Sequence, residues 1–281
     1  MSYTHFNVSF PASHQYVAHV EINRPDKLNA FIEGMWLEMK TIFDDLSSSP
    51  EVRAIVLTGA GDRAFTAGLD VKAASEGLLG KDSLMGPDSD MARVAVKFRR
   101  TVAEFQECVS SIERCEKPVI TVLHGITFGL GIDICSAADV RICTADVRCS
   151  VKEVDIGMAA DAGTLTRLPK VVGAFGWVKE VALTAREFGA EESLRVGFVN
   201  AVHPSKVDAV NAALELAALM GRKSPVAVQG TKELLNWSRD RSVADGLRYT
   251  GVWNSAAVQT RDITNALLSS LQKRTPTFEK L

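Results

Sequence analysis

Apolar and polar positions along the chain follow two periods, which predicts a mixture of strands and helices. Three short runs, 17–22, 54–58 and 119–123, are apolar throughout or alternate residue by residue, as strands of a buried or half-buried sheet do. Residues 33–46 and 91–115 instead repeat their apolar positions with the period of a helix that has one buried face. Strands that alternate with helices favour an α/β fold with a largely parallel sheet.

The pattern becomes mostly helical after Pro169. One last short strand is predicted over 198–202, and the glycine-rich stretch 76–90 is interpreted as a mobile excursion. We expect a core over residues 1–204 and a C-terminal helical region over residues 205–281. The predicted helices of the second half are 175–183, 186–197, 205–220 with Ser205 as its N-cap, 225–237, 243–253 and 256–271.

The helical tail is too apolar to bury itself on a small body. We therefore expect it to pack on neighbouring subunits of an oligomer. The alternative is that the tail folds back onto its own domain.

Composition narrows the classes of partner. A net charge of −2 over 281 residues provides no basic field for nucleic acid or an anionic membrane. No run approaches the roughly 18 apolar residues of a membrane span, and the first residues lack the features of a signal or transit peptide. Five cysteines without CxxC spacing are typical of buried, reduced thiols in an intracellular protein. The five histidines lack metal-ligand spacing, so we expect no metal.

The chain ends in Glu279-Lys280-Leu281, which shares its last two residues with the peroxisomal address Ser-Lys-Leu. Glu in place of a small residue weakens this match. Peroxisomal localisation is therefore a hypothesis beside mitochondrial or cytoplasmic localisation, and the Leu could also end a polar tail by chance.

Two glycine-containing loops each follow a buried strand. One is Thr66-Ala67-Gly68-Leu69-Asp70, and the other is the run FGLGID over 128–133. Backbone N–H groups of such loops can converge on one carbonyl oxygen, and the second loop would lie at a helix N-terminus, whose dipole favours negative charge. The plainer interpretation is that both are turns that need Gly for a positive φ.

Three acids stand among apolar neighbours near the second loop: Asp133, Glu153 and Asp161. Acids in such surroundings are candidates for proton transfer. Structural interpretations also exist. Glu153 and Asp155 could form a solvated turn, Asp161 could cap a helix over 162–168, and Asp133 could be a first-turn acid.

Together these motifs resemble the crotonase (enoyl-CoA hydratase/isomerase) superfamily. The resemblance rests on RPDKLNA at 24–30, on AFTAGLD at 64–70, and on GLGID at 129–133 with a further Asp139, and it covers most of the chain. The run VKEVDIGMAADAGTLTRLPKVVG at 151–173 is similar to the Δ3,5-Δ2,4-dienoyl-CoA isomerases, which place Asp, Glu and Asp where this chain has Asp133, Glu153 and Asp161.

The resemblance implies a crotonase-like ββα spiral core with a C-terminal helical trimerisation region, assembled as a homotrimer or homohexamer. It also implies an acyl-CoA substrate, and no cofactor because coenzyme A is part of that substrate. The thioester oxygen would lie between the N–H groups of Leu69 and Leu130, with Thr66 to Asp70 along the thioester and pantetheine. The family usually has Gly where this chain has Leu130, so the oxyanion hole requires Leu130 to keep a negative φ.

Three acids suit a dienoyl isomerisation. A 3,5-dienoyl thioester loses a proton at C2 and gains one at C6, through a dienolate whose charge reaches the thioester oxygen. Because the two carbons lie far apart, two carboxyl groups serve better than one. Our hypothesis places Glu153 at C2 and Asp161 at C6, with Asp133 polarising or hydrogen-bonding nearby.

Other functions remain open at this point. An enoyl-CoA hydratase uses two glutamates, and the shorter Asp133 would place the water differently. A Δ3-Δ2-enoyl-CoA isomerase needs one acid and leaves Asp161 unexplained. An RNA-binding relative would need clusters of Lys and Arg, which the chain lacks.

Three further polar residues have alternative interpretations. His124 could line the pocket or pack within a loop. Lys232 could meet a phosphate of coenzyme A or lie on the surface. Asp139 precedes an apolar run, so we expect it to hold the start of a strand. Residues 72–100 are expected to wall the acyl pocket.

Overall fold

The computed structural model describes residues 3–76 and 90–281. The excursion predicted over 76–90 therefore falls almost wholly outside the described residues.

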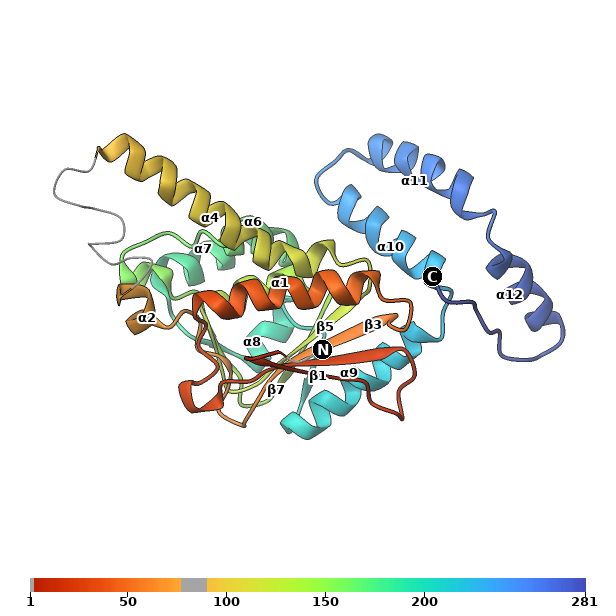
Figure 1. Cartoon of the computed structure of the whole chain (residues 1–281), viewed down its shortest axis with the longest axis horizontal. Helices are drawn as coiled ribbons and strands as arrows, with labels where there is room; N and C mark the ends of the chain where they lie inside the picture. Colours follow the sequence, from red (N-terminus) through yellow and green to blue (C-terminus); the bar gives the residue numbers. More distant parts are fainter. Residues whose placement is uncertain (1–2, 77–89) are drawn as a thin grey trace.

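A six-stranded sheet runs through the body of the molecule, in the order β1-β2-β3-β5-β7-β10 (Figure 1). β1 pairs antiparallel with β2, and the other neighbours are parallel. Helices cover both faces, so every side chain of β3 and β5 is buried, which explains their continuous apolar runs. The three predicted strands and the parallel arrangement are confirmed. The strands are Phe6–Ser9 (β1), Val17–Ile22 (β2), Ala54–Gly59 (β3), Val119–Leu123 (β5), Val140–Thr144 (β7) and Ala201–His203 (β10).

A second sheet of very short strands stands beside the first, in the order β4-β6-β8-β9. β4, β6 and β8 each follow a strand of the large sheet, and a helical segment comes after each pair of strands, which gives a repeating ββα unit. This repetition is the spiral core that the resemblance implied. The strands are Ala64–Thr66 (β4), Ile126–Phe128 (β6), Arg148–Ser150 (β8) and Phe188–Gly189 (β9).

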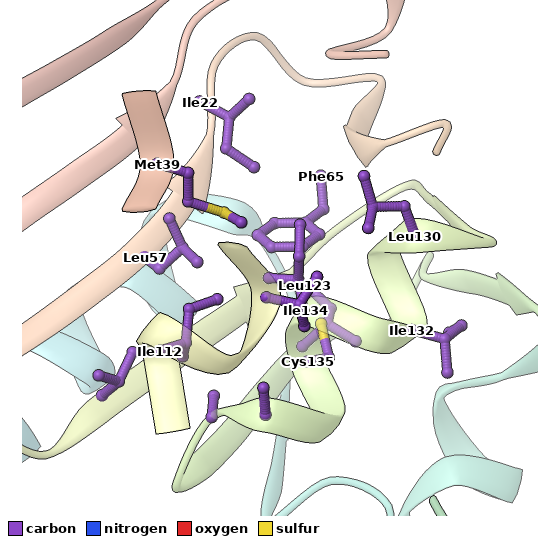
Figure 2. Packing of buried hydrophobic residues seen from close by; sticks show 14 of the residues in the cluster. Ile22, Met39, Leu57, Phe65, Ile112, Leu123, Leu130, Ile132, Ile134 and Cys135 are labelled. Carbon is purple, nitrogen blue, oxygen red and sulfur yellow. The ribbon is translucent and has the colours of Figure 1, made fainter. Parts of the chain in front are cut away.

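The main core lies between the large sheet and the helices α1, α4 and α5. Figure 2 shows Met39 of α1, Ile112 of α4 and Ile134 of α5 meeting Leu57 of β3 and Leu123 of β5. The helices on this side and around the second sheet are Glu33–Ser48 (α1), Val71–Glu76 (α2), Met91–Arg114 (α4), Leu130–Ala137 (α5), Thr164–Val171 (α6), Phe175–Thr184 (α7) and Ala190–Arg195 (α8), with 3-10 turns at Pro25–Lys27 (η1) and Glu153–Ile156 (η2).

Helix α9, Lys206–Gly221, covers the other face of the sheet (Figure 1). Ala209, Ala213 and Ala217 pack there on Val56 and Ile120, and small side chains let the helix approach the strands closely. Ser205 caps α9 as predicted, because its hydroxyl accepts a hydrogen bond from the Asp208 N–H. The division of the chain at residue 204 stays a prediction.

Three helices follow α9, of which the last two extend from the body (Figure 1): α10 (Pro225–Ser238), α11 (Val243–Ala257) and α12 (Arg261–Leu271). α10 folds back on its own domain, since Lys232 and Arg239 form ion pairs with Asp139 and Glu113 at 2.7 and 2.6 Å. α11 and α12 leave Leu247 and Leu271 69% and 82% exposed. Burial of these two helices in an oligomer therefore stays a prediction.

Three boundaries differ from the sequence prediction. The helix predicted over 186–197 is wrong in its first part, because β9 pairs there with β8 and α8 begins only at Ala190. The strand predicted over 198–202 begins at Ala201. The helix predicted from 256 begins at Arg261, because α11 continues to Ala257 and the Thr260 side chain caps α12.

Candidate functional site

One pocket collects the candidate residues of several elements. Its floor is formed by the loop after β4, the start of α5 and the η2 segment, and its apolar walls come from α1 and α4. Phe98 lies within the wall expected over 72–100. Trp36 and the residues beyond 100 were not predicted as walls, although the helical period places Val102 and Phe105 on the same face as Phe98. The lining residues are Trp36, Ala67, Gly68, Leu69, Val71, Phe98, Thr101, Val102, Phe105, Gly129, Leu130, Asp133, Lys152, Glu153, Ile156, Met158, Asp161 and Ala162.

The two glycine loops lie in contact. Gly68 has a φ of +91°, and a Cβ added there would stand 2.8 Å from Phe128 O and 3.5 Å from Leu130 N. Only glycine allows this approach, which brings Leu69 beside Leu130 at the pocket surface.

The backbone N–H groups of Leu69 and Leu130 are both available to a ligand. Phe31 N donates to Gly68 O and Asp70 N donates to Phe31 O, so the Leu69 N–H between them points away from Phe31. Leu130 is the first residue of α5, where backbone N–H groups lack partners within the helix. Among the described residues, no group accepts a hydrogen bond from either N–H. Gly129 takes the positive φ of +51°, and Leu130 keeps a negative one.

Thr66 and Asp70 hold the first loop in shape. The Thr66 hydroxyl donates to Asn29 O at 2.7 Å and accepts from Gly68 N at 3.0 Å. The Asp70 carboxylate forms an ion pair with Arg24 at 2.8 Å and accepts a hydrogen bond from Ala73 N. Ala67, Gly68 and Leu69 reach the pocket surface, whereas Thr66 is fully buried behind them.

Replacing Gly68 tests the contact between the loops. We expect Gly68→Ala to lower kcat at least about tenfold. The new Cβ would stand 2.8 Å from Phe128 O, so the second loop would have to shift, and the Leu130 N–H would move with it. Gly197→Ala is the matched control, since Gly197 also has a positive φ but has nothing within 4 Å of an added Cβ. Both variants lose stability through φ strain. Equal kcat in the two variants would contradict the prediction, and steady-state kinetics with urea unfolding measure it.

Asp133 is the most deeply buried of the three acids. It lies in the first turn of α5, is 1% exposed, and its Oδ1 accepts hydrogen bonds from Thr164 N at 2.6 Å and Thr164 Oγ1 at 2.7 Å. Burial raises the pKa of Asp133 to about 6, against the lowering effect of the two bonds from Thr164. The first-turn position is as expected, but its partner is a residue far along the chain.

Glu153 lies on η2, and its side chain faces the start of α5. A Cβ added to Gly129 would stand 3.3 Å from Glu153 Oε1, and Glu153 Oε2 is buried without a hydrogen-bond partner among the described residues. Burial, and next the charge of Asp133, raise the pKa of Glu153 to about 7. The interpretation as a solvated turn is therefore wrong for Glu153. It holds for Asp155, which is exposed and paired with Lys152 at 3.0 Å.

Asp161 also lines the pocket, in the segment between η2 and α6. Its backbone carbonyl accepts a hydrogen bond from Gln106 Nε2 at 2.6 Å, which ties this segment to α4. Burial raises the pKa of its carboxyl group. The interpretation of Asp161 as a helix cap is wrong, because α6 begins at Thr164 and its N-cap is Gly163. The pocket thus brings together three carboxyl groups whose pKa values are all raised.

The raised pKa values predict how stability depends on pH. The pKa of the Glu153 carboxyl group is about 7 in the folded protein and near 4.5 in the unfolded chain. Between these two pH values the folded protein therefore binds this proton more tightly than the unfolded chain does. The free energy of unfolding should therefore fall as pH rises from about 4.5 to about 7. Glu153→Gln should lose part of this slope and exceed the wild type by up to about 3 kcal/mol at about pH 8.

Urea unfolding at about pH 4.5 and pH 8 measures this difference. Asp155→Asn is the control. Because the Asp155 side chain is exposed, this substitution should leave the pH dependence of the free energy of unfolding unchanged. A Glu153→Gln variant whose slope matches that of the wild type would show that Glu153 does not carry the raised pKa.

Three other predicted residues lie outside the pocket lining. His124 is buried, with Nε2 2.9 Å from Gly61 O, so it is a packed loop residue. Asp139 accepts a hydrogen bond from Val119 N at 2.7 Å, which confirms that it holds a strand start. Lys232 is 8% exposed and bonds to Asp139 and Lys117 O, so its interpretation as a surface lysine is wrong, and its contact with a phosphate of coenzyme A stays a prediction.

Residues 3–76 and 90–281 contain no group of three or more His, Cys, Asp or Glu side chains arranged to hold a metal ion. Over the same residues, no helix combines the length and apolar character needed to cross a bilayer.

Comparison with known proteins agrees with the fold and with the motifs. The family model for enoyl-CoA hydratase/isomerase matches residues 12–280. The mitochondrial Δ3,5-Δ2,4-dienoyl-CoA isomerase of Rattus norvegicus is 42% identical over 98% of this chain and 83% of its own length. The peroxisomal Δ3,5-Δ2,4-dienoyl-CoA isomerase of Arabidopsis thaliana is 40% identical over 94% of this chain and 93% of its own length.

Among solved structures, the enoyl-CoA hydratase from Bacillus anthracis superposes with a TM-score of 0.86 at 25% identity, over 98% of this chain and 99% of that protein. The family match spans nearly the whole chain and includes both glycine loops and all three acids. The chain therefore belongs to the enoyl-CoA hydratase/isomerase family.

Proposed function

We propose that this protein is a Δ3,5-Δ2,4-dienoyl-CoA isomerase, which converts a 3,5-dienoyl-CoA to the 2,4-dienoyl-CoA during β-oxidation of unsaturated fatty acids. The observation that carries the proposal is the position of three carboxyl groups with raised pKa values in one pocket, beside two available backbone N–H groups. Relatives at about 40% identity that bear this activity in their names support it.

In the proposed mechanism the thioester oxygen accepts hydrogen bonds from Leu69 N–H and Leu130 N–H. The Glu153 carboxylate removes a proton from C2, and the C–H electrons enter the dienolate, whose charge the two N–H groups stabilise. The dienolate then takes a proton at C6 from the Asp161 carboxyl group. Proton exchange with water returns both acids to their starting states.

The raised pKa values suit these roles. A base with a pKa of about 7 is partly ionised at neutral pH and still accepts a proton well. Burial favours the protonated form of Asp161, as the acid requires. Asp133 would act through its charge on Glu153. The apolar walls from α4 and Trp36 would hold the acyl chain.

The test is an ultraviolet assay with 3,5-octadienoyl-CoA, run beside hydration of a trans-2-enoyl-CoA. Conjugation of the two double bonds with the thioester moves the absorbance to longer wavelength, so product formation is read directly. Fast conversion of the dienoyl substrate with slow hydration supports the proposal. Dominant hydration would make the protein a hydratase instead, and conversion of 3-enoyl-CoA alone would make it a Δ3-Δ2-enoyl-CoA isomerase.

We also propose assembly as a homotrimer or homohexamer through α11 and α12. Support comes from the apolar side chains that these helices leave exposed: Val243, Leu247, Val252, Leu267 and Leu271. Light scattering at the protein's working concentration distinguishes a monomer from either assembly.

We propose peroxisomal localisation, with the mitochondrion as the alternative, since relatives of both compartments are known. The C-terminal segment is held on the body, where Arg53 donates to Phe278 O and Glu279 O and Lys280 pairs with Glu51. A receptor for the last three residues would compete with these contacts. Unchanged punctate localisation of a fluorescent fusion without Lys280 and Leu281 would contradict this address.

A further inference from the structure

Thr164 is the partner that holds the Asp133 carboxylate in place. Both residues are buried, at 0% and 1% exposure, and both bonds from Thr164 end on the same oxygen, Oδ1. No partner of Asp133 Oδ2 is found among the described residues, and Asp133 lines the pocket. Thr164 therefore fixes one oxygen and leaves the other to the pocket.

The backbone explains why Asp133 takes this position. Gly163, the N-cap of α6, has a φ of +143° and no side chain to cap the helix, so the first turn of α6 lacks an acceptor of its own. The Asp133 carboxylate supplies this acceptor from α5, and the positive end of the α6 dipole favours its negative charge.

Ionisable groups surround Asp133 on several sides. Arg167 on α6 favours the ionised carboxylate, and Asp161 opposes it. Arg167 is itself held by α4, where its Nε lies 3.0 Å from Glu113 Oε2 and its Nη2 lies 2.8 Å from Ser110 Oγ. Glu153 lines the same pocket as Asp133 and its pKa is raised by burial and next by the charge of Asp133, and Cys135 on α5 is a buried neutral thiol.

We propose that Thr164 is a positioning residue of this active site, which acts through Asp133: its hydroxyl and its N–H fix the carboxylate so that a negative charge is held in the same pocket as Glu153. The inference rests on the proposed function. Thr164 belongs to neither the predicted site nor the pocket lining, and it touches the reaction only through Asp133.

The charge on Asp133 has a direct effect on the base. Asp133 is the second cause, after burial, that raises the pKa of Glu153. Without the Thr164 hydroxyl, Asp133 should hold its proton to higher pH, and Glu153 should then ionise at lower pH because its charged neighbour is lost.

The test compares Thr164→Val with Thr164→Ser. Val keeps the size and the N–H but lacks the hydroxyl, and Ser keeps the hydroxyl. We expect Thr164→Val to lower kcat about tenfold or more, to leave KM within about twofold, and to move the acid limb of the pH profile of kcat to lower pH. Thr164→Ser should restore most of the activity and the wild-type profile. Equal loss in both variants, or a wild-type profile in Thr164→Val, would overturn the inference.

A second readout does not depend on the reaction. NMR of protein with ¹³C-labelled Asp carboxyl groups follows the titration of Asp133, which is assigned by its absence in Asp133→Asn. Thr164→Val should raise the pKa of Asp133 above its wild-type value of about 6. If this pKa stays unchanged, the inference fails even in an active isomerase. If the pKa rises but the wild type does not convert dienoyl-CoA, the proposed function fails and the positioning of Asp133 stands.

Discussion

Glu153→Gln is expected to lower kcat for 3,5-dienoyl-CoA by about 10²–10⁴-fold and to change KM little, because general base catalysis contributes about this much. The amide keeps the size of the side chain and removes its ability to take the C2 proton. Glu153 Oε2 is buried and has no hydrogen-bond partner among the described residues, so this oxygen remains available to a substrate. Steady-state kinetics in the ultraviolet assay measure the effect.

Asp155→Asn is the matched control. Asp155 lies on the same η2 segment, is exposed and pairs with Lys152, and it does not line the pocket. Its variant should keep kcat within about twofold of the wild type. A Glu153→Gln enzyme with more than about a tenth of wild-type kcat would contradict the role of Glu153 as the base.

Asp161→Asn is expected to lower kcat by a similar factor of about 10²–10⁴, because the dienolate then lacks an acid at C6. This variant also separates the proposed isomerase from related activities. Hydration and Δ3-Δ2 isomerisation need no acid at C6, so their rates should change less than the rate with 3,5-dienoyl-CoA.

Deuterium exchange distinguishes the acid that removes the C2 proton from the acid that donates a proton to C6. In D₂O, Asp161→Asn should still exchange the C2 protons of the 3,5-dienoyl substrate through Glu153, without forming product. Glu153→Gln should neither exchange them nor form product. NMR of the recovered substrate reads the label. Exchange at C2 in Glu153→Gln but not in Asp161→Asn would reverse the assignment of the two acids.

The large elements of the fold could be predicted from the sequence because each has a strong local pattern. Three strands, α1, α4 and the cap of α9 at Ser205 were predicted within a few residues of their observed bounds. β4, β6 and β8 were missed as strands because three residues are too few to show an alternation. β9 was absorbed into a predicted helix, since its pairing with β8 joins distant residues.

The candidate site was predictable where the glycine loops and the acids had a recognisable spacing. In the structure, Gly68 lets the two glycine loops come into contact, and Glu153 has a buried carboxyl oxygen. These two observations explain physically why the residues have this spacing. Thr164 and Lys232 could not be placed from the sequence, because their partners Asp133 and Asp139 lie far away along the chain. The burial of the Lys232 side chain could not be predicted from the sequence either, since a lysine is ordinarily exposed.

A single turnover in D₂O with excess enzyme tests the two-carboxyl mechanism most directly. The Asp161 carboxyl exchanges with solvent before the substrate arrives, so the proposed mechanism predicts one deuterium at C6 of nearly every 2,4-dienoyl-CoA product. A single acid that carries the proton from C2 to C6 would instead leave protium at C6. NMR of the product distinguishes the two results, and protium at C6 would contradict the separate roles of Glu153 and Asp161.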